Sequence, residues 1–302
     1  YAVINPHRAD CPYPDKELAG VGVTFKLVQA LWQTEEQRLY ADDLDIAALG
    51  TIADLVPLIG ENRKIVQAGL AHMSARPCTG ISALIRVSGC EGKAINTGMV
   101  GFQLAPRLNA AGRIETARSG VELLSSADAS EADRLASELN ALNTERRDLE
   151  QEILAEAKAL LADFTPDVPA IVVAGEDWNS GVIGIVASRL VETYYRPSIV
   201  LTRQGDVYKG SCRSIVGLPM YEALAACGDT LIQFGGHEMA AGLTLARDRV
   251  EDFRRAFANY VKESLAMEDF TPKISIEAIV APADWTLAMV EELALLEPYG
   301  MG

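Results

Sequence analysis

Cysteine pairs, long apolar runs and an excess of basic residues are all missing from this sequence. Its five cysteines are scattered, at positions 11, 78, 90, 212 and 227, without a Cys-x-x-Cys pair. This pattern argues against a zinc site and suits a reducing cytoplasm. No apolar run reaches the ~18 residues that a membrane span requires, so we expect no membrane association through a spanning helix.

Acidic residues outnumber basic ones, 42 against 27, and the formal net charge is −15. This net charge argues against broad, non-specific adhesion to nucleic acids or anionic membranes. A local basic cleft is still allowed, because exposed charges more than about 10 Å apart are screened at physiological salt. Any site for a polyanion must be built from a few placed arginines, lysines and backbone N–H groups.

The length of 302 residues favours two domains. Apolar periodicity predicts helices over residues 18–32, 61–73, 81–87, 130–162, 181–194, 218–227, 249–265 and 287–296, and a further helix from residue 44 that Asp42 or Asp43 caps. It predicts strands over residues 1–6, 170–174, 197–202, 207–211, 239–245 and 273–280. Strands that alternate with helices after residue 168 indicate an α/β fold.

The stretch Gly235-Gly236-His237 precedes a small, apolar run and is the most suggestive motif of the chain. Paired glycines in a turn let backbone N–H groups approach an anion closely, and a histidine can donate a further hydrogen bond. The alternative is a tight hairpin whose histidine faces solvent. Short glycine motifs alone do not decide between the two.

A lone carboxylate, Asp54, lies in the apolar run from Ala48 to Leu58, which Pro57 terminates. A buried, unpaired carboxylate is costly, so we expect Asp54 to have a partner. A metal ion is one candidate, and a helix cap or an arginine is the other.

Three polar residues, Arg107, Asn109 and Arg113, surround small residues after Pro106, which we expect to end the preceding helix. Arginine offers a rigid fork of donors for phosphate oxygens, so the segment is a candidate anion site. The alternative is a solvated loop with incidental charges.

A second polar cluster, residues 209–214, combines Lys209, Ser211, Arg213 and Ser214 at the end of a predicted strand. Alone it fits a charged strand end. Together with the glycine-histidine turn it becomes a candidate phosphate pocket. The long helix over residues 130–162 has an interrupted apolar repeat, which favours a rigid spacer between two domains over a coiled coil.

These motifs, in this order, resemble the RecJ family of single-strand-specific 5′→3′ DNA exonucleases within the DHH phosphoesterase superfamily. The resemblance covers essentially the whole chain. The segments that carry it are Leu49 to Asp54, Pro106 to Arg113, Gly210 to Ser214, Gly235 to Gly242, and Leu296 to Gly302. Two residues depart from the family pattern: Asn179 stands where a histidine is frequent, and Cys212 where a glycine is common.

The resemblance implies a domain order that starts with the C-terminal portion of a DHH domain (residues 1–125). A long connecting helix (126–165), a smaller α/β DHH-associated domain (166–268) and a lead-in to an OB-fold (269–302) follow. The Asp-His-His motif itself does not occur in these 302 residues. Both ends look cut, so we expect a fragment that is inactive alone although the parent enzyme is active.

The resemblance also implies the mechanism, in which two Mn²⁺ or Mg²⁺ ions assist phosphodiester hydrolysis during DNA repair and recombination. Asp54 would be the catalytic and metal-binding residue. The substrate-binding residues would be Arg107, Asn109, Arg113, Ser211, Arg213, Ser214, Gly235, Gly236 and His237. Aromatic residues, at 6%, are too few for a stacking residue to be assigned from the sequence.

The implied partner is single-stranded DNA with a 5′ end, with a helicase or a single-strand-binding protein as candidate protein partners of a monomeric enzyme. Two alternatives remain open. One is a DHH-type phosphodiesterase that acts on short oligonucleotides or cyclic dinucleotides. The other is a non-catalytic, RecJ-like replication scaffold.

Overall fold

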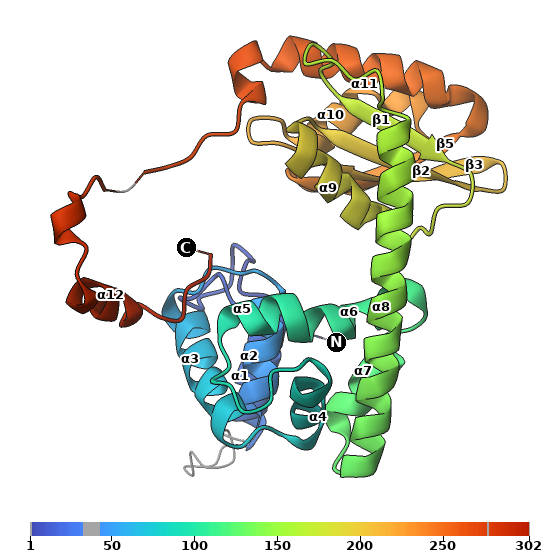
Figure 1. Ribbon diagram of the computed structural model, residues 1–302. Helices are drawn as coiled ribbons and strands as arrows, with labels where there is room; N and C mark the ends of the chain where they lie inside the picture. The colour runs from blue at the N-terminus through green and yellow to red at the C-terminus, as the bar shows by residue number, and fades with distance from the viewer. Residues whose placement is uncertain (1, 33–42, 277, 302) are drawn as a thin grey trace. The chain divides into compact units, whose positions relative to one another are not determined.

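The computed structural model describes residues 2–32, 43–276 and 278–301, and these residues form two compact units (Figure 1). Unit 1 comprises Tyr1–Asn143 together with Ala278–Gly302, and unit 2 comprises Thr144–Glu277. The boundary falls inside one long helix, α8 (Ala129–Ala159).

Unit 1 is helical in its described part. Its elements are α1 (Gly20–Trp32), α2 (Leu44–Ala53), α3 (Gly60–Ala75), α4 (Thr79–Val87), α5 (Thr97–Met99), a π-helical turn (Val100–Leu104), α6 (Ala105–Ile114), α7 (Arg118–Ser125) and α12 (Leu287–Ala294). Ile52, Met73, Leu84, Leu123 and Leu139, from five different helices, lie in one buried cluster. Burial of this shared apolar surface is what holds the short helices together.

One arginine fixes the last described residues of the chain to unit 1. The guanidinium of Arg63 on α3 donates to the carbonyls of Leu296 (2.6 Å), Glu297 (2.9 Å) and Pro298 (3.0 Å). The N–H of Leu58 then donates to the carbonyl of Met301 at 2.7 Å. Backbone carbonyls of residues 296–301 therefore tie this segment to α3 and to the connection before it.

Unit 2 contains a five-stranded mixed sheet, counted over its described residues, with the strand order β1-β2-β3-β5-β4. The strands are β1 (Ile171–Gly175), β2 (Ser198–Gln204), β3 (Val207–Arg213), β4 (Gln233–Gly236) and β5 (Ala240–Ala246). β1 and β2 are parallel and are joined through α9 (Ile183–Tyr194), whereas the other neighbouring strands are antiparallel.

The two faces of this sheet have different neighbours. Tyr208 and Cys212 of β3 are buried in a cluster with Leu224 of α10 (Met220–Ala226) and Phe253 and Phe257 of α11 (Val250–Ser264). The side chains that alternate with these two along β3, such as that of Ser211, point to the other face of the sheet. That face is covered by α9, which contacts β2 and β3. Figure 1 shows α9 and α11 on opposite sides of the sheet.

The α/β fold predicted from the sequence is confirmed, and most predicted helices begin within a few residues of their observed start. Two predicted strands are wrong. Residues 2–5 and the described part of 273–280 form no strand and pair with no other strand. Their apolar side chains, such as those of Val3 and Ile274, are exposed and so gain no burial from a sheet.

The prediction that Asp42 or Asp43 caps α2 is wrong for Asp43, which occupies the N-cap position without a side-chain hydrogen bond to the helix. Asp42 lies outside the described residues, so that half of the prediction stays a prediction. Among the helices that the structure describes, none combines the length and apolar character needed to cross a membrane.

We expect Arg63→Ala to release residues 296–301 from unit 1. Loss of three hydrogen bonds from a charged donor to exposed carbonyls should lower local stability by about 1–3 kcal/mol. The measurement is hydrogen exchange at the Leu58 amide, which should lose protection. Lys64→Ala, an exposed neighbour on the same helix, is the control. Equal protection in both variants would show that Arg63 is not the anchor.

Candidate functional site

The face of β3 turned away from the unit 2 core carries the polar side chains predicted from the sequence. Lys209, Ser211 and Arg213 alternate with the buried Tyr208 and Cys212. Because successive side chains of a strand point to opposite faces, these three residues line up along one face. This alignment brings Ser211 and Arg213 together as the sequence suggested.

Glycines form the floor of a groove beside this row. Ser211 of β3 pairs with Gly242 of β5, which in turn pairs with Gly235 of β4. A Cβ at Gly235 would meet nothing within 4 Å, and one at Gly242 would come no closer than 3.7 Å to another atom. The fold therefore does not need glycine at these two positions, whereas a ligand that approaches the backbone does.

A cavity of about 520 Å³ lies over these strands. Polar side chains, glycines and three apolar residues (Ile183, Phe234 and Leu243) line it. They come from β3, β4, β5 and the start of α9 with the residues before it: Ser180, Ile183, Lys209, Gly210, Ser211, Gln233, Phe234, Gly235, Gly242, Leu243 and Thr244. Hydroxyl, amide and ammonium donors around a glycine floor are suited to a phosphate-bearing ligand.

Arg213 lies next to this cavity, under the first turn of α9. A Cβ at Gly184 would fall 2.9 Å from Ser211 Oγ and 3.2 Å from Arg213 Nη2, so α9 approaches both side chains closely. The guanidinium donates to the carbonyl of Cys212 at 2.8 Å, and burial lowers its pKa. A partly buried arginine held in this way remains charged at neutral pH, and its N–H groups can donate to a bound anion.

The glycine-histidine motif is arranged differently from the prediction. Gly235 and Gly236 lie in the extended strand β4, and the turn consists of residues 237–239. The N–H of His237 donates to the carbonyl of Ala240 at 2.8 Å and closes the hairpin. His237 is exposed beside the groove and does not line the cavity. The predicted nest of consecutive amides in a glycine turn is therefore wrong.

Ser214 is the predicted ligand that the fold separates from the others. It is buried, and its hydroxyl donates to the carbonyl of Leu218 at 2.6 Å. Its N–H donates to the carbonyl of Met239. Both donors hold the chain between β3 and α10, so this residue shapes the groove from behind.

The two residues that depart from the family pattern, Cys212 and Asn179, both have local structural roles. Cys212 is fully buried on the core face of β3, and burial raises the pKa of its thiol to about 12. It therefore points away from the groove. The side-chain oxygen of Asn179 accepts from the N–H of Gly181 at 2.8 Å and so stabilises the entry to α9.

In unit 1, Asp54 lies at the C-terminal end of α2 and is exposed. The prediction that this carboxylate is buried and needs a partner is wrong, because the helix ends one residue earlier and turns it outward. Asp54 lines a cavity of about 630 Å³ together with residues that include His7, Gly20 and Thr24. Its carboxylate makes no hydrogen bond or ion pair with the rest of the described chain.

An exposed carboxylate facing a cavity is a suitable oxygen ligand for a hard divalent cation. The described residues contain no group of three or more His, Cys, Asp or Glu side chains that could hold a metal ion. Asp54 therefore fits as one ligand of a metal site and not as a complete site.

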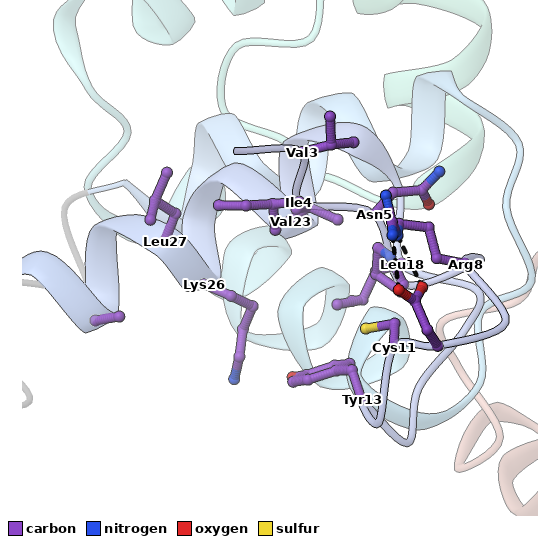
Figure 2. Close-up of a pocket in the computed structure, with 13 residues that line it drawn as sticks. Val3, Ile4, Asn5, Arg8, Cys11, Tyr13, Leu18, Val23, Lys26 and Leu27 are labelled. Carbon is purple, nitrogen blue, oxygen red and sulfur yellow. Dashed lines mark hydrogen bonds and ion pairs between the residues drawn. The ribbon is translucent and has the colours of Figure 1, made fainter. Parts of the chain in front are cut away.

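A second, more apolar pocket of about 620 Å³ adjoins the Asp54 cavity (Figure 2). The two share several residues, among them Val3, Ile4, Leu18 and Val23. Figure 2 shows Leu27 and Lys26 of α1 on one side of the pocket and Arg8 on the other. Arg8 forms an ion pair with Asp10 at 2.7 Å. Residues 3–6 thus contribute to both pockets.

The segment around Arg107 is a helix, α6, so the alternative of a solvated loop is wrong. Pro106 lies in the first turn of α6 and begins the helix rather than ending the preceding one, because proline is tolerated where the helix needs no N–H. Asn109 and Arg113, four residues apart, share an exposed face of α6. Arg107 instead donates through Nε to Asn140 Oδ1 of α8 at 2.9 Å and to the carbonyl of Gln103.

Several groove and surface residues were missed by sequence reasoning. Gln233, Thr244 and Ser180 line the unit 2 cavity, but nothing in their local sequence marks them. Lys209 belonged to a cluster already singled out, and strict alternation along β3 would have added it. Phe102, on the π-helical turn before α6, is 85% exposed, and a π turn has no sequence signature that periodicity reveals.

Comparison with known proteins adds an independent line of information. Residues 167–263 match the model of the DHHA1 domain. The chain is 45% identical to the single-stranded-DNA-specific exonuclease RecJ of Bacillus subtilis, over 99% of this chain and 38% of that protein. It is 39% identical to the protein of the same name from Escherichia coli, over 99% of this chain and 56% of that one.

Solved structures agree with this likeness. The structure of RecJ from Thermus thermophilus in complex with Mg²⁺ superposes with a TM-score of 0.84 at 34% identity, covering 96% of this chain and 45% of that chain. A structure of exonuclease RecJ bound to manganese gives a TM-score of 0.70 at 34% identity, over 86% of this chain and 67% of that one. The chain thus spans 38% of the length of the Bacillus subtilis protein and 56% of the length of the Escherichia coli protein.

The two neighbouring glycines of β4 should respond differently to alanine. Gly236 has φ +154°, and a Cβ there would lie 2.4 Å from the Ala240 carbonyl oxygen, so Gly236→Ala should destabilise unit 2 by about 1–3 kcal/mol. Gly235→Ala should stay within about 0.5 kcal/mol of the parent protein. The measurement is hydrogen exchange of the buried β2 amides. A large loss in the Gly235 variant would mean that the fold, not a ligand, requires glycine there.

Proposed function

Because the chain belongs to the RecJ family, we propose that it forms part of a single-strand-specific 5′→3′ DNA exonuclease that hydrolyses phosphodiester bonds with two metal ions. The observation that carries the proposal is the glycine-floored groove of unit 2, in which Ser211, Gly242 and Gly235 line up across three strands beside Arg213. Such a groove admits a phosphate against the backbone and surrounds it with donors.

The proposal assigns a separate task to each unit. Unit 1, with residues 1–125 as the C-terminal portion of a DHH domain, supplies Asp54 as one oxygen ligand. Unit 2, with residues 166–268 as the DHH-associated domain, holds the 5′-terminal phosphate through Arg213, Ser211 and the glycine floor, and His237 contributes from the rim of the groove. Residues 126–165 connect the two, and residues 269–302 lead to a further OB-fold domain.

The metal ions suited to this site are Mn²⁺ and Mg²⁺, the ions present in the solved RecJ structures. When bound, they activate a water molecule and stabilise the leaving oxygen. Asp54 fits this chemistry as a hard, exposed oxygen ligand without a competing cation among the described residues. Since one carboxylate does not hold two ions, we infer that these 302 residues bind DNA but do not cleave it alone.

The surface of α6 and the preceding turn supports a grip on the strand in unit 1. Phe102 offers an exposed ring for base stacking, which is tolerant of sequence because every base has a π face. Asn109 and Arg113 present polar donors on the next turns of the chain. A Cβ at Gly101 would lie 3.8 Å from Ile52 Cγ2, so this turn adjoins α2, the helix that Asp54 follows. Arg107 supports the surface by fixing α6 to α8.

We place this activity in DNA repair and recombination, where single strands are resected from their 5′ ends. A helicase or a single-strand-binding protein that exposes such strands is the expected partner of a monomeric enzyme.

Asp54→Asn should reduce Mn²⁺-dependent cleavage of 5′-phosphorylated single strands by at least about a hundredfold in the full-length enzyme. Loss of an outer-shell partner of a metal already costs about 10–100-fold, and a direct ligand should cost no less. Asp43→Asn, at the other end of α2, is the matched control and should keep full activity.

Binding should behave differently from cleavage. The 302-residue chain should bind the same strands in EDTA, with the Asp54 variant equal to the parent chain, because the unit 2 groove uses no metal. Robust cleavage by the 302 residues alone, or absence of any single-strand binding, would contradict the proposal.

Phe102→Ala should weaken binding of single-stranded DNA by about 1–3 kcal/mol, the contribution of one stacked base. Thermal stability should change little, because the ring is mostly exposed. Phe102→Trp should retain affinity, and Val121→Ala, an exposed apolar residue of the same unit, should have no effect. Fluorescence anisotropy with a labelled oligonucleotide measures the affinity of all three variants. An unchanged affinity of the Phe102→Ala variant would show that Phe102 does not contact the strand.

A further inference from the structure

One wall of the unit 2 groove is an irregular segment, residues 176–182, which has neither helix nor strand structure. Ser180 of this segment lines the cavity. Gly184, in the first turn of α9 that follows, lies close to the side chains of Ser211 and Arg213. Because the segment belongs to no helix or strand, its place over the phosphate-binding side chains must be fixed by individual contacts.

Trp178 is the anchor of this segment. Its side chain is buried, and its ring packs so closely against Gly175 that a Cβ at that position would collide with it. Its carbonyl accepts from the hydroxyl of Thr202, a buried residue of β2, at 2.6 Å. Since Ser180 follows shortly after Trp178 in the chain, the placement of the tryptophan limits where the groove wall can lie.

The indole N–H of Trp178 is bound by the connecting helix. Nε1 donates to Glu156 Oε2 at 2.6 Å, and Glu156 is an exposed residue of α8 that lies 22 residues earlier in the chain. An indole N–H is a donor only, and in a buried tryptophan it needs an acceptor. A carboxylate acceptor makes this bond stronger than one between two neutral groups.

α8 also holds α9 at a second point. The nearly buried carboxylate of Glu150 on α8 accepts from Arg189 Nε of α9 at 3.0 Å. Arg146, one turn earlier on α8, donates to the same carboxylate at 3.0 Å. α8 therefore binds both the helix α9 and the segment before it, and all of these residues belong to unit 2.

Glu156 is separate from the ligand site that it supports. It does not line the cavity, and it lies outside the buried apolar cluster of unit 2. Its removal should therefore leave the core under the sheet in place. What it should change is the support of Trp178, and through it the position of the groove wall.

We propose that Glu156 is a positioning residue for the phosphate groove: through Trp178 it holds the groove wall, with Ser180, over the phosphate-binding side chains. The proposal rests on the proposed function of this groove. It adds that the connecting helix determines how well the groove binds a 5′ phosphate, beyond its task of joining the two units.

The test compares two oligothymidylates of equal length, one with a 5′ phosphate and one with a 5′ hydroxyl, in equilibrium binding to the 302-residue chain in EDTA. The ratio of the two dissociation constants measures the contribution of the 5′ phosphate. Glu156→Ala removes the acceptor, and Trp178→Phe keeps an apolar ring but removes the donor. Each variant should lower the ratio by about tenfold, which corresponds to one hydrogen bond to a charged group.

Matched variants identify the hydrogen bond as the cause. Glu156→Gln keeps an acceptor oxygen and should retain most of the ratio. Glu152→Ala removes an exposed carboxylate one turn earlier on α8 and should keep the parent ratio. The double variant with Glu156→Ala and Trp178→Phe should lose no more than either single variant, because both changes break the same contact.

The outcomes separate this inference from the proposed function. If the parent chain prefers the 5′ phosphate and the ratio is unchanged in Glu156→Ala, or falls equally in Glu152→Ala, the positioning role is refuted while the proposed function stands. An equal loss of affinity for both oligonucleotides refutes it too, because that result indicates a general loss of structure. If the parent chain shows no preference for the 5′ phosphate, the proposed function of the groove itself fails.

Discussion

The two-residue alternation of β3 is the constraint on which unit 2 depends. On one face of this strand, Tyr208 and Cys212 belong to the apolar core that includes residues of α10 and α11. On the other face, the strand carries Lys209, Ser211 and Arg213. A shift of register by one residue would exchange the two sets and destroy core and groove together. The same alternation that buries the core therefore fixes the order and spacing of the polar groups on the open face.

Much of the fold was predictable, because long segments with a clear period leave little choice. The α/β organisation, the long helix α8 and the order of strands and helices in unit 2 all followed from apolar spacing. The failures have physical causes. Residues 273–280 alternate like a strand in sequence, but their described part has no neighbouring strand to pair with. Pro106 suggests a helix end, although proline equally begins helices.

The candidate site was predictable in its residue types and less so in its geometry. Ser211 and Arg213 could be placed on one strand face, but the placement of Gly235 in β4 rather than in the turn depends on pairing with β5, a tertiary interaction. The burial expected for Asp54 came from its apolar neighbours, whereas its exposure follows from where α2 ends. Ser214 looked like part of the cluster, and only the fold shows its hydroxyl bound to Leu218.

The edge strand β4 has a consequence for solubility. An unpaired sheet edge invites a strand from another molecule and can seed aggregation, a hazard that grows with the length and β-propensity of the edge. β4 has four residues, and it ends in two glycines, which favour strands weakly. The glycines that leave room for a ligand above the sheet thus also make the edge strand β4 a poor template for a strand from another chain.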